Sequence, residues 1–245
     1  MISLCLNKEE ASSALKHIGS KGYFETLISS YLEAYGTNYN FCEFYLQYSD
    51  DIVTSVILRY NSYIYLISND NADKEELSAF LSGYKDSLLY SCDNLFFEQN
   101  NVKTCFLLSV IPEDSLVNSL VLDVSDSPKK VADLVTKDMS ISQKDDFYLN
   151  TSYQIRHDVL RVYGYISDKK VVSVAGVTRE YKGVCAITFV YTDEYFRGNG
   201  YSKEVLNTVC SSTDCEYQLL CEDHNIEFYK KCGFRQVGIC YEIRL

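Results

Sequence analysis

The sequence predicts an α+β fold, of the α/β type with a mixed sheet, divided into two domains. Its 245 residues are 47% hydrophobic and 23% charged, which is typical of a folded globular chain. Segments with helical spacing of apolar residues alternate with short β-rich runs along the chain. The length allows one large domain or two small ones.

The distribution of charge predicts a domain boundary between residues 125 and 126. Residues 1–125 hold 7 basic and 17 acidic residues, a net charge of −10, whereas residues 126–245 hold 16 and 17, a net charge of −1. At this point a polar segment runs into a helix signal, with Ser127 as N-cap and Pro128 at the first helical position. We therefore expect a smaller domain of helices and strands over 1–125 and a second domain over 126–245.

The first half is predicted to begin with helices and to continue as a small sheet. Asn7 and Glu10 have the spacing of a capping box, and the helix they begin is expected to end near Gly19. Asp73, three residues before Glu76, predicts the start of a later helix. The predicted helices are 7–19, 24–35 and 73–83, and the predicted strands are 52–60, 63–68, 88–90 and 104–111.

The second half shows strands and helices in a clearer order. The third of its strands is almost continuously apolar and leads into a glycine-containing turn, which is followed by a helix with an apolar face. The predicted strands are 159–166, 171–178, 184–192, 217–221 and 236–243, and the predicted helices are 128–139, 147–157, one that follows Ser202, and 225–232.

Composition argues against several classes of protein. An excess of acidic residues and a pI of about 4.8 disfavour nucleic-acid binding, because phosphate contacts need a basic face. No apolar run approaches the roughly 18 residues of a membrane span, and the segment Met1–Cys5 lacks the basic region of a signal peptide. We expect a cytoplasmic protein without nucleic-acid or membrane partners.

The cysteines do not predict a metal site. Ten cysteines occur without a CxxC motif, the spacing of Cys210, Cys215 and Cys221 fits no zinc module, and the chain has only three histidines. We expect most of these thiols to be small buried hydrophobic groups in a reducing compartment.

The strand–glycine turn–helix step at residues 184–210 has the features of an anion site. The start of a helix leaves about four backbone N–H groups unpaired and carries the positive end of the helix dipole. Gly198 and Gly200 allow a phosphate to approach these donors, and Arg197 adds a positive charge. The segment matches neither a Walker A loop nor a dinucleotide-binding GxGxxG motif.

A second motif follows the next buried strand. Arg197-Gly198-Asn199-Gly200-Tyr201-Ser202 after one strand and Asn225-Ile226-Glu227-Phe228-Tyr229-Lys230-Lys231-Cys232-Gly233-Phe234 after the next together resemble the GNAT superfamily of acetyl-CoA-dependent N-acetyltransferases. The resemblance spans about 100 residues, from Asp145 to Leu245. It implies a GNAT-like second domain that uses acetyl-CoA as acyl donor.

The resemblance assigns roles to particular residues. The family's pyrophosphate loop, Q/R-x-x-G-x-G/A, falls on residues 195–200, where Tyr195 replaces the usual Gln or Arg. Tyr229 has the position of the phenol that protonates the leaving thiolate, and Asn225 either lines the cofactor or caps its helix. The implied cofactor-binding residues are Thr188, Phe189 and Val190 on the strand, Arg197, Gly198, Asn199, Gly200, Tyr201 and Ser202 in the loop and helix start, and Asn225.

The sequence offers several candidates for the general base. Some family members use a Glu early in the third strand of the domain, but this region here reads Gly183-Val184-Cys185-Ala186. An ammonium group must lose a proton before it can attack a thioester, often to water held by a carboxylate. Glu222, Asp223 and His224 end the next strand and are the candidates, with Glu222 foremost. They also fit a polar connection without a catalytic role.

Two functions remain open. The first is N-acetyl transfer to a primary amine of a small molecule or peptide by direct attack in a ternary complex. The second is a non-catalytic acyl-CoA sensor, in which Tyr229 only packs. The first half lacks a glycine loop and is interpreted as a degenerate GNAT-like unit whose acidity favours a cationic acceptor. We expect a monomer or a homodimer.

Overall fold

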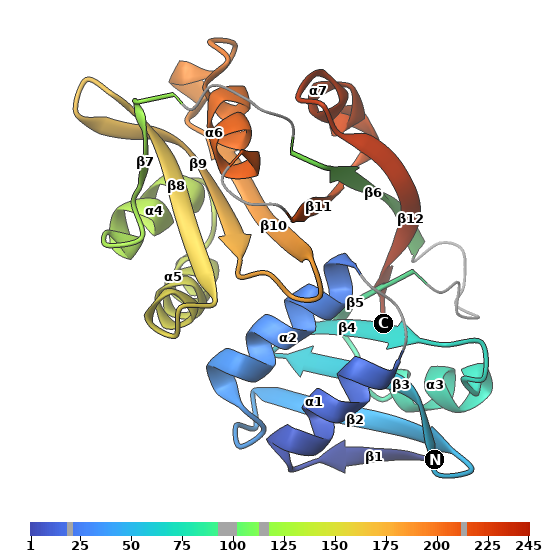
Figure 1. The fold of residues 1–245 in the computed structure, drawn as a ribbon. Helices are drawn as coiled ribbons and strands as arrows, with labels where there is room; N and C mark the ends of the chain where they lie inside the picture. Colours follow the sequence, from blue (N-terminus) through green and yellow to red (C-terminus); the bar gives the residue numbers. More distant parts are fainter. Residues whose placement is uncertain (19–21, 93–101, 113–117, 212–214) are drawn as a thin grey trace. The chain divides into compact units, whose positions relative to one another are not determined.

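The chain folds into two compact units in the computed structural model, which describes residues 1–18, 22–92, 102–112, 118–211 and 215–245 (Figure 1). The first unit comprises 1–108, 220–226 and 236–245, and the second comprises 109–219 and 227–235. The division therefore falls at residues 108 and 109, and two segments near the C-terminus belong to the first unit. The domain boundary between residues 125 and 126, expected from the change in charge along the chain, stays a prediction.

The first unit is a sheet with helices on both faces. Its strands have the order β1-β2-β3-β4-β5-β12-β6. β1 with β2, β2 with β3, β3 with β4 and β5 with β12 pair antiparallel, whereas β4 and β5 are parallel. The elements are β1 (Ile2–Cys5), α1 (Lys8–His17), α2 (Tyr23–Tyr35), β2 (Cys42–Ser49), β3 (Ile52–Tyr60), β4 (Tyr63–Ser68), α3 (Lys74–Leu81), β5 (Leu88–Ser91), β6 (Val102–Val110) and β12 (Arg235–Arg244).

Alternation along β4 separates the two faces of this sheet. Ile64 and Leu66 are fully buried in an aliphatic cluster that includes Leu77 and Leu81 of α3. Tyr65, between them, points to the other face, where its ring lies 6.3 Å from that of Tyr31 on α2. Successive side chains of a strand point to opposite faces, so α3 covers one face and α2 the other.

The second unit has the same plan. Its strands have the order β11-β10-β9-β8-β7, and only the pairing of β10 with β11 is parallel. The elements are β7 (Val121–Asp123), α4 (Pro128–Val135), α5 (Ile141–Arg156), β8 (Leu160–Ser167), β9 (Lys170–Thr178), β10 (Val184–Thr192), the 3₁₀ turn Glu194–Phe196, α6 (Tyr201–Cys210), β11 (Glu216–Cys221), the 3₁₀ turn Asp223–Asn225 and α7 (Ile226–Lys231). β11 ends in the segment that belongs to the first unit, as does the turn after it.

Alternation along β9 again separates two layers of helices. Val174 is fully buried in a cluster with Val131 and Val135 of α4. The hydroxyl of the preceding Ser173 instead contacts that of Thr192, which contacts Ser202 of α6. Helices α4 and α5 thus cover one face of this sheet and α6 covers the other (Figure 1).

The two units therefore repeat one order of elements. The series β1-α1-α2-β2-β3-β4-α3-β5 corresponds to β7-α4-α5-β8-β9-β10-α6-β11, and in both the last two strands are parallel neighbours. In this correspondence α3 of the first unit takes the place of α6 in the second. The mixed α/β fold predicted from the sequence is confirmed.

Most predicted elements are present, with different ends. Three strands were not predicted, the short β1 and β7 and the eight-residue β2. Helix α4 ends at Val135 instead of residue 139. The helix expected from residue 147 begins at Ile141, where Ser140 and Gln143 form a capping box. Ser127 is the N-cap of α4, but its side chain makes no capping bond. Gly19, the expected end of the first helix, lies outside the described residues.

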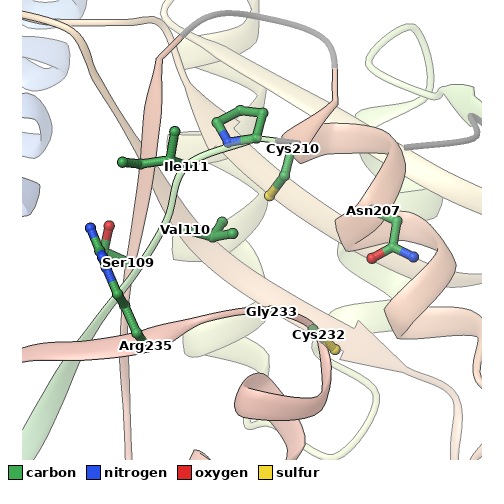
Figure 2. Close-up of a pocket in the computed structure, with 9 residues that line it drawn as sticks. Ser109, Val110, Ile111, Asn207, Cys210, Cys232, Gly233 and Arg235 are labelled. Atoms are coloured by element: carbon green, nitrogen blue, oxygen red, sulfur yellow. The ribbon is translucent and has the colours of Figure 1, made fainter. Parts of the chain in front are cut away.

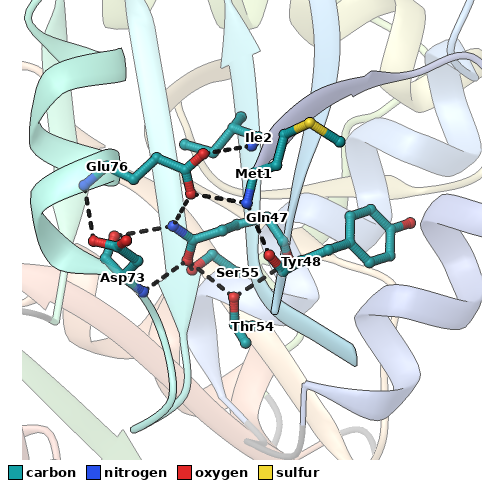
Figure 3. A network of polar contacts seen from close by, with 8 residues as sticks. All are labelled: Met1, Ile2, Gln47, Tyr48, Thr54, Ser55, Asp73 and Glu76. Atoms are coloured by element: carbon teal, nitrogen blue, oxygen red, sulfur yellow. Dashed lines mark hydrogen bonds and ion pairs between the residues drawn. The ribbon is translucent and has the colours of Figure 1, made fainter. Parts of the chain in front are cut away.

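A buried glutamine ties the start of α3 to the first unit's sheet (Figure 3). The side chain of Gln47, on β2, is 1% exposed. Its amide nitrogen donates to the Asp73 carbonyl at 2.9 Å and to the Glu76 carboxylate at 2.8 Å. Its oxygen accepts from the hydroxyls of Thr54 at 2.9 Å and Ser55 at 3.1 Å. One side chain therefore satisfies polar groups from β3 and from the start of α3.

We predict that Gln47→Leu lowers the free energy of unfolding by about 2–4 kcal/mol, because it leaves several buried polar groups without a partner. The change is measured by urea unfolding. The exposed Gln236 provides the matched control, and Gln236→Leu is expected to change stability by less than about 0.5 kcal/mol. Equal effects of the two variants would show that the network is not stabilising.

Candidate functional site

The parallel strands β10 and β11 pair only at their beginning. In the described part of the chain, the ladder consists of Val184↔Glu216, Cys185↔Tyr217 and Ala186↔Gln218. β10 continues to Thr192, so its later backbone groups on this edge are not used by a ladder with β11. Such a divergence between parallel neighbours leaves backbone donors and acceptors available to a ligand.

The strand residues predicted to bind the cofactor lie where β10 is irregular. The register with β9 shifts between Ile187 and Phe189, so Thr188 is the extra residue of a bulge. The ring of Phe189 packs against Gly176, where a Cβ would lie 2.3 Å from its Cε1 atom. It also meets Phe147 of α5 edge-on, with centroids 5.2 Å apart. The Phe189 side chain is thus used in packing, and this residue can offer a ligand its backbone.

The glycine loop gives α6 an open start. Gly198 and Gly200 have φ of +79° and +82°, and a Cβ at either position would meet no atom within 4 Å. Gly200 is the N-cap of α6 and, as a glycine, supplies no side-chain capping bond. The first backbone N–H groups of α6 therefore face an uncovered space with the positive end of the helix dipole. This is the arrangement that binds phosphate groups.

Arg197 stands beside this helix start as an unneutralised cation. Its Nε atom donates to the Thr192 carbonyl at 3.2 Å, and its guanidinium lies 5.9 Å from the centre of the Tyr191 ring. Among the described residues it has no acidic partner within ion-pair distance. Asn199 does not extend outward, because its amide donates to the carbonyls of Phe196 and Arg197 at 3.1 and 3.4 Å.

Two residues at the start of α6 fix the helix to the sheet. The hydroxyl of Ser202 lies 3.0 Å from that of Thr192, which lies 2.8 Å from that of Ser173. The ring of Tyr201 stacks on Tyr165 of β8 with centroids 4.3 Å apart. The loop motif includes Ser202 and Tyr201, but nothing in the local sequence indicates their partners Thr192 and Tyr165.

The corresponding helix start in the first unit is closed. Asp73 is the N-cap of α3, and its carboxylate accepts from the backbone N–H of Glu76 at 2.9 Å. Glu75 and Glu76 add negative charge in the first turn. An anion at this position would meet carboxylates where the start of α6 offers free N–H groups. The two helix starts thus differ in the property that matters for binding phosphate.

Tyr195, which departs from the family's loop pattern, does not support the anion site. It is 80% exposed, and its ring lies 4.7 Å from the Nζ atom of Lys137. The same ammonium lies 3.0 Å from the Glu194 carboxylate and 3.8 Å from that of Asp193. Lys137 is therefore largely neutralised, and Arg197 is the free cation of the loop among the described residues.

Tyr229 is half-buried on α7. Its ring lies 5.0 Å from that of Phe228 and 5.8 Å from that of Phe234, and its carbonyl accepts from the Phe234 backbone. The neighbouring rings fix the orientation of the phenol, as a proton donor at a defined place requires. Tyr229 belongs to the second unit, together with β10 and α6.

Glu222 and its neighbours belong to the first unit's segment 220–226. The Glu222 carboxylate lies 2.7 Å from the Lys103 ammonium and 3.6 Å from the His224 ring. The hydrogen bond from Lys103 is the main cause that lowers the pKa of Glu222. Asn225, which was considered as a helix cap or cofactor contact, has its amide 3.1 Å from His224.

A separate cavity of about 420 Å³ lies at the other end of α6 (Figure 2). Asn207 and Cys210 line it from the last helical turns, and Arg235 lines it from the start of β12. None of the residues predicted to bind the cofactor is among its walls. A smaller cavity of about 230 Å³ is lined by residues of β8, β9, β10 and β11.

The ten cysteines are all in the reduced state, and eight of them are buried. Burial raises the pKa of Cys232 and Cys221 to about 11 each, so both are protonated at neutral pH. Within the described ranges, no group of three or more His, Cys, Asp and Glu side chains could hold a metal ion. No helix described here is long and apolar enough to cross a membrane.

Comparison with known families identifies the domain that contains this site. Residues 129–234 match the model of the acetyltransferase (GNAT) family. This part of the chain is a GNAT domain, and the family resemblance seen in the sequence is confirmed. A search of curated proteins finds no match to the sequence.

Solved structures share the fold across nearly the whole chain. A Drosophila protein superposes with a TM-score of 0.68 at 10% identity, covering 100% of this chain and 98% of its own. A GNAT-family acetyltransferase from Colwellia psychrerythraea gives 0.57 at 11% identity, with both chains covered completely. A tandem GNAT protein from the clavulanic acid biosynthesis pathway gives 0.59 at 10% identity, covering 99% and 98%. At these identities the similarity establishes the fold alone.

We predict that the Glu222 carboxyl titrates below about 4.3, the usual value for glutamate, because the Lys103 ammonium stabilises its ionised form. Carbon-detected NMR of the side chain measures the midpoint. Lys103→Met should raise the midpoint toward the usual value. A midpoint near neutrality in the unmodified protein would contradict this assignment and would make Glu222 a strong base.

Proposed function

We propose that the protein is an N-acetyltransferase that transfers the acetyl group of acetyl-CoA directly to a primary amine. The observation that carries the proposal is the open start of α6, directly after a parallel strand that has left its neighbour. Acetyl-CoA supplies an activated acetyl thioester when bound. The chain's own residues supply binding, orientation and the movement of protons.

The residues of the loop fit a pyrophosphate. Backbone N–H groups from Arg197 to Ser202 provide the donors, and the glycines leave space for close approach. Arg197 adds a positive charge that no carboxylate of the described chain neutralises. Thr192 and Ser173 hold Ser202, so this donor set is fixed before a ligand binds.

The free edge of β10 and the phenol of Tyr229 supply the remaining steps. A backbone N–H at Thr188, Phe189 or Val190 can donate to the acetyl carbonyl, where negative charge develops during attack. Tyr229 gives a proton to the departing thiolate. The amine attacks and the thiol departs without an acyl-enzyme, because the described part of the site has no cysteine activated by a neighbouring histidine.

Glu222 is the proposed acceptor of the amine proton, through water. Its ion pair with Lys103 keeps the carboxylate ionised and able to accept a proton. The same ion pair makes it a weak base, since the pKa of the group is lowered. This predicts that the acceptor amine reacts faster at alkaline pH, where more of it is already neutral.

The first unit is proposed to be a GNAT-like unit that has lost cofactor binding. Its element order repeats that of the second unit, but the start of α3 is closed by Asp73 and surrounded by acidic residues. The net charge of −10 over residues 1–125 favours a cationic small-molecule or peptide amine as acceptor. A cytoplasmic monomer or homodimer remains the prediction for its location and assembly.

A non-catalytic acyl-CoA sensor is the alternative. The weak base at Glu222 and the exposed Tyr195 in place of the usual loop residue favour it. The packing of Tyr229 against Phe228 and Phe234 also suits a purely structural role. Turnover distinguishes the two functions, since a sensor binds the cofactor without using it.

We predict that the unmodified protein binds acetyl-CoA with micromolar affinity and that Gly200→Val weakens binding at least 10-fold. A valine is strained at the backbone φ of +82° that this position has, and its side chain stands where the ligand approaches the backbone. Calorimetric titration measures the affinity. Gly183, with a φ of +83° and open space around it, is the matched control, and Gly183→Val should bind normally. Equal binding by both variants would exclude the loop as the site.

We also predict that Tyr229→Phe lowers kcat about 100-fold while the Kd for acetyl-CoA changes little, because only the proton donor is removed. The assay follows release of free thiol with a panel of primary amines. Tyr148→Phe, on the exposed side of α5, should leave both constants unchanged. Unchanged kcat in Tyr229→Phe would remove the tyrosine from the mechanism. Binding without turnover for any amine would favour the sensor.

A further inference from the structure

Two pairs of cysteines have their sulfur atoms in contact, and they differ in access to solvent. The sulfurs of Cys92 and Cys240 are 3.3 Å apart, and those of Cys185 and Cys215 are 2.7 Å apart. Cys92 is exposed, whereas the other three are buried. The sequence predicts most of the cysteines to be buried hydrophobic groups, but spacing along the chain does not show which of them meet.

Cys92 and Cys240 lie at one end of the antiparallel pair of β5 and β12 in the first unit. β5 pairs with β12 through Ser91↔Tyr241, and Cys92 directly follows the end of β5, next to the position of Cys240 on β12. Directly opposed residues of antiparallel strands have Cα atoms about 4.5–5.5 Å apart, which lies within the range that a disulfide spans. The sulfurs, 3.3 Å apart, must approach to about 2.05 Å to bond.

We propose that Cys92 and Cys240 form a redox-active dithiol that a peroxide converts to a disulfide, with Cys92 as the thiol that the oxidant reaches. The Cys92 thiolate attacks one peroxide oxygen, the O–O bond breaks, and Cys92 becomes a sulfenic acid with release of water. The Cys240 sulfur then attacks the Cys92 sulfur, the S–O bond breaks, and a second water leaves. Two thiols are oxidised and one peroxide is reduced to two waters.

Oxidation of this pair would link β12, which carries Cys240, to the residue that follows β5. β12 carries Cys240 and is joined to β5 by backbone hydrogen bonds over residues 241–244. The disulfide would connect positions that are 148 residues apart in sequence. A cross-link over such a long loop restricts the unfolded chain strongly and therefore stabilises the folded unit.

The buried pair provides an internal control within the same molecule. Cys185 and Cys215 are 5% and 4% exposed, so a dissolved peroxide does not reach them in the folded protein. If proximity of sulfurs alone decided the reaction, this pair would oxidise first, since its sulfurs are closer. If access decides, Cys92 and Cys240 oxidise first.

The test treats the purified full-length chain with dilute hydrogen peroxide, blocks remaining thiols after unfolding, and maps disulfide-linked peptides by mass spectrometry. We expect one linkage, Cys92 to Cys240, reversed by dithiothreitol, and a higher midpoint of urea unfolding in the oxidised protein. Cys92→Ser should abolish the linkage. Cys105→Ser, which removes a neighbouring buried thiol, should leave it intact.

Two further results would overturn the proposal. One is irreversible oxidation of Cys92 to a sulfinic acid with Cys240 still reduced, which would show that Cys240 does not resolve the sulfenic acid. The other is formation of the Cys185–Cys215 linkage at a lower peroxide dose. Cys240→Ser separates the steps, because Cys92 should then persist as a sulfenic acid that dimedone labels.

Discussion

The backbone N–H groups at the start of a helix need partners, and the way each unit meets this requirement determines what it can do. In the first unit the Asp73 carboxylate supplies the partner from within the chain. In the second unit Gly200 supplies none. The same order of strands and helices therefore yields one closed helix start and one open helix start. The glycines, the free Arg197 and the divergence of β10 from β11 have a common consequence, which is a preformed place for an anion beside a free strand edge.

Holding that place open needs support from the sheet. Ser202 and Tyr201 are attached to β10 and β8 through Thr192 and Tyr165, so the first turn of α6 keeps its position without a capping side chain. The bulge at Thr188 occurs where the pairing with β11 has ended. Backbone groups that make few hydrogen bonds within the described chain are thus concentrated at one location, as preorganised ligand sites require. The first unit has no equivalent arrangement at the start of α3, where the Asp73 carboxylate accepts from the Glu76 N–H and Glu75 and Glu76 add negative charge.

Local sequence signals predicted most of this fold because they depend on neighbouring residues. Asn7 and Asp73 were predicted as caps, and both side chains accept from backbone N–H groups as expected. β2 alternates buried and half-buried residues from Cys42 to Leu46, a signal that was present and not used. β1 and β7 are too short to show a period, and their existence depends on β2 and β8. The capping box of Ser140 and Gln143 could have indicated the early start of α5.

The candidate site was predictable only in part. The glycine loop and Tyr229 were visible as motifs, but the ion pair of Glu222 with Lys103 joins residues far apart in the chain. That contact changes the chemistry of Glu222 from a possible strong base to a weak one. The pairing of Cys92 with Cys240 depends in the same way on β12 lying beside β5, which no local pattern indicates.

An amide NMR titration of the isotope-labelled protein with CoA compares the two helix starts directly in one experiment. If the uncapped helix start is the cofactor site, the amides of Gly198, Gly200 and Ser202 shift strongly and those of Glu75 and Glu76 do not. Shifts at the start of α3, or none at the start of α6 in a folded protein that binds CoA, would show that the uncapped helix start is not the cofactor site.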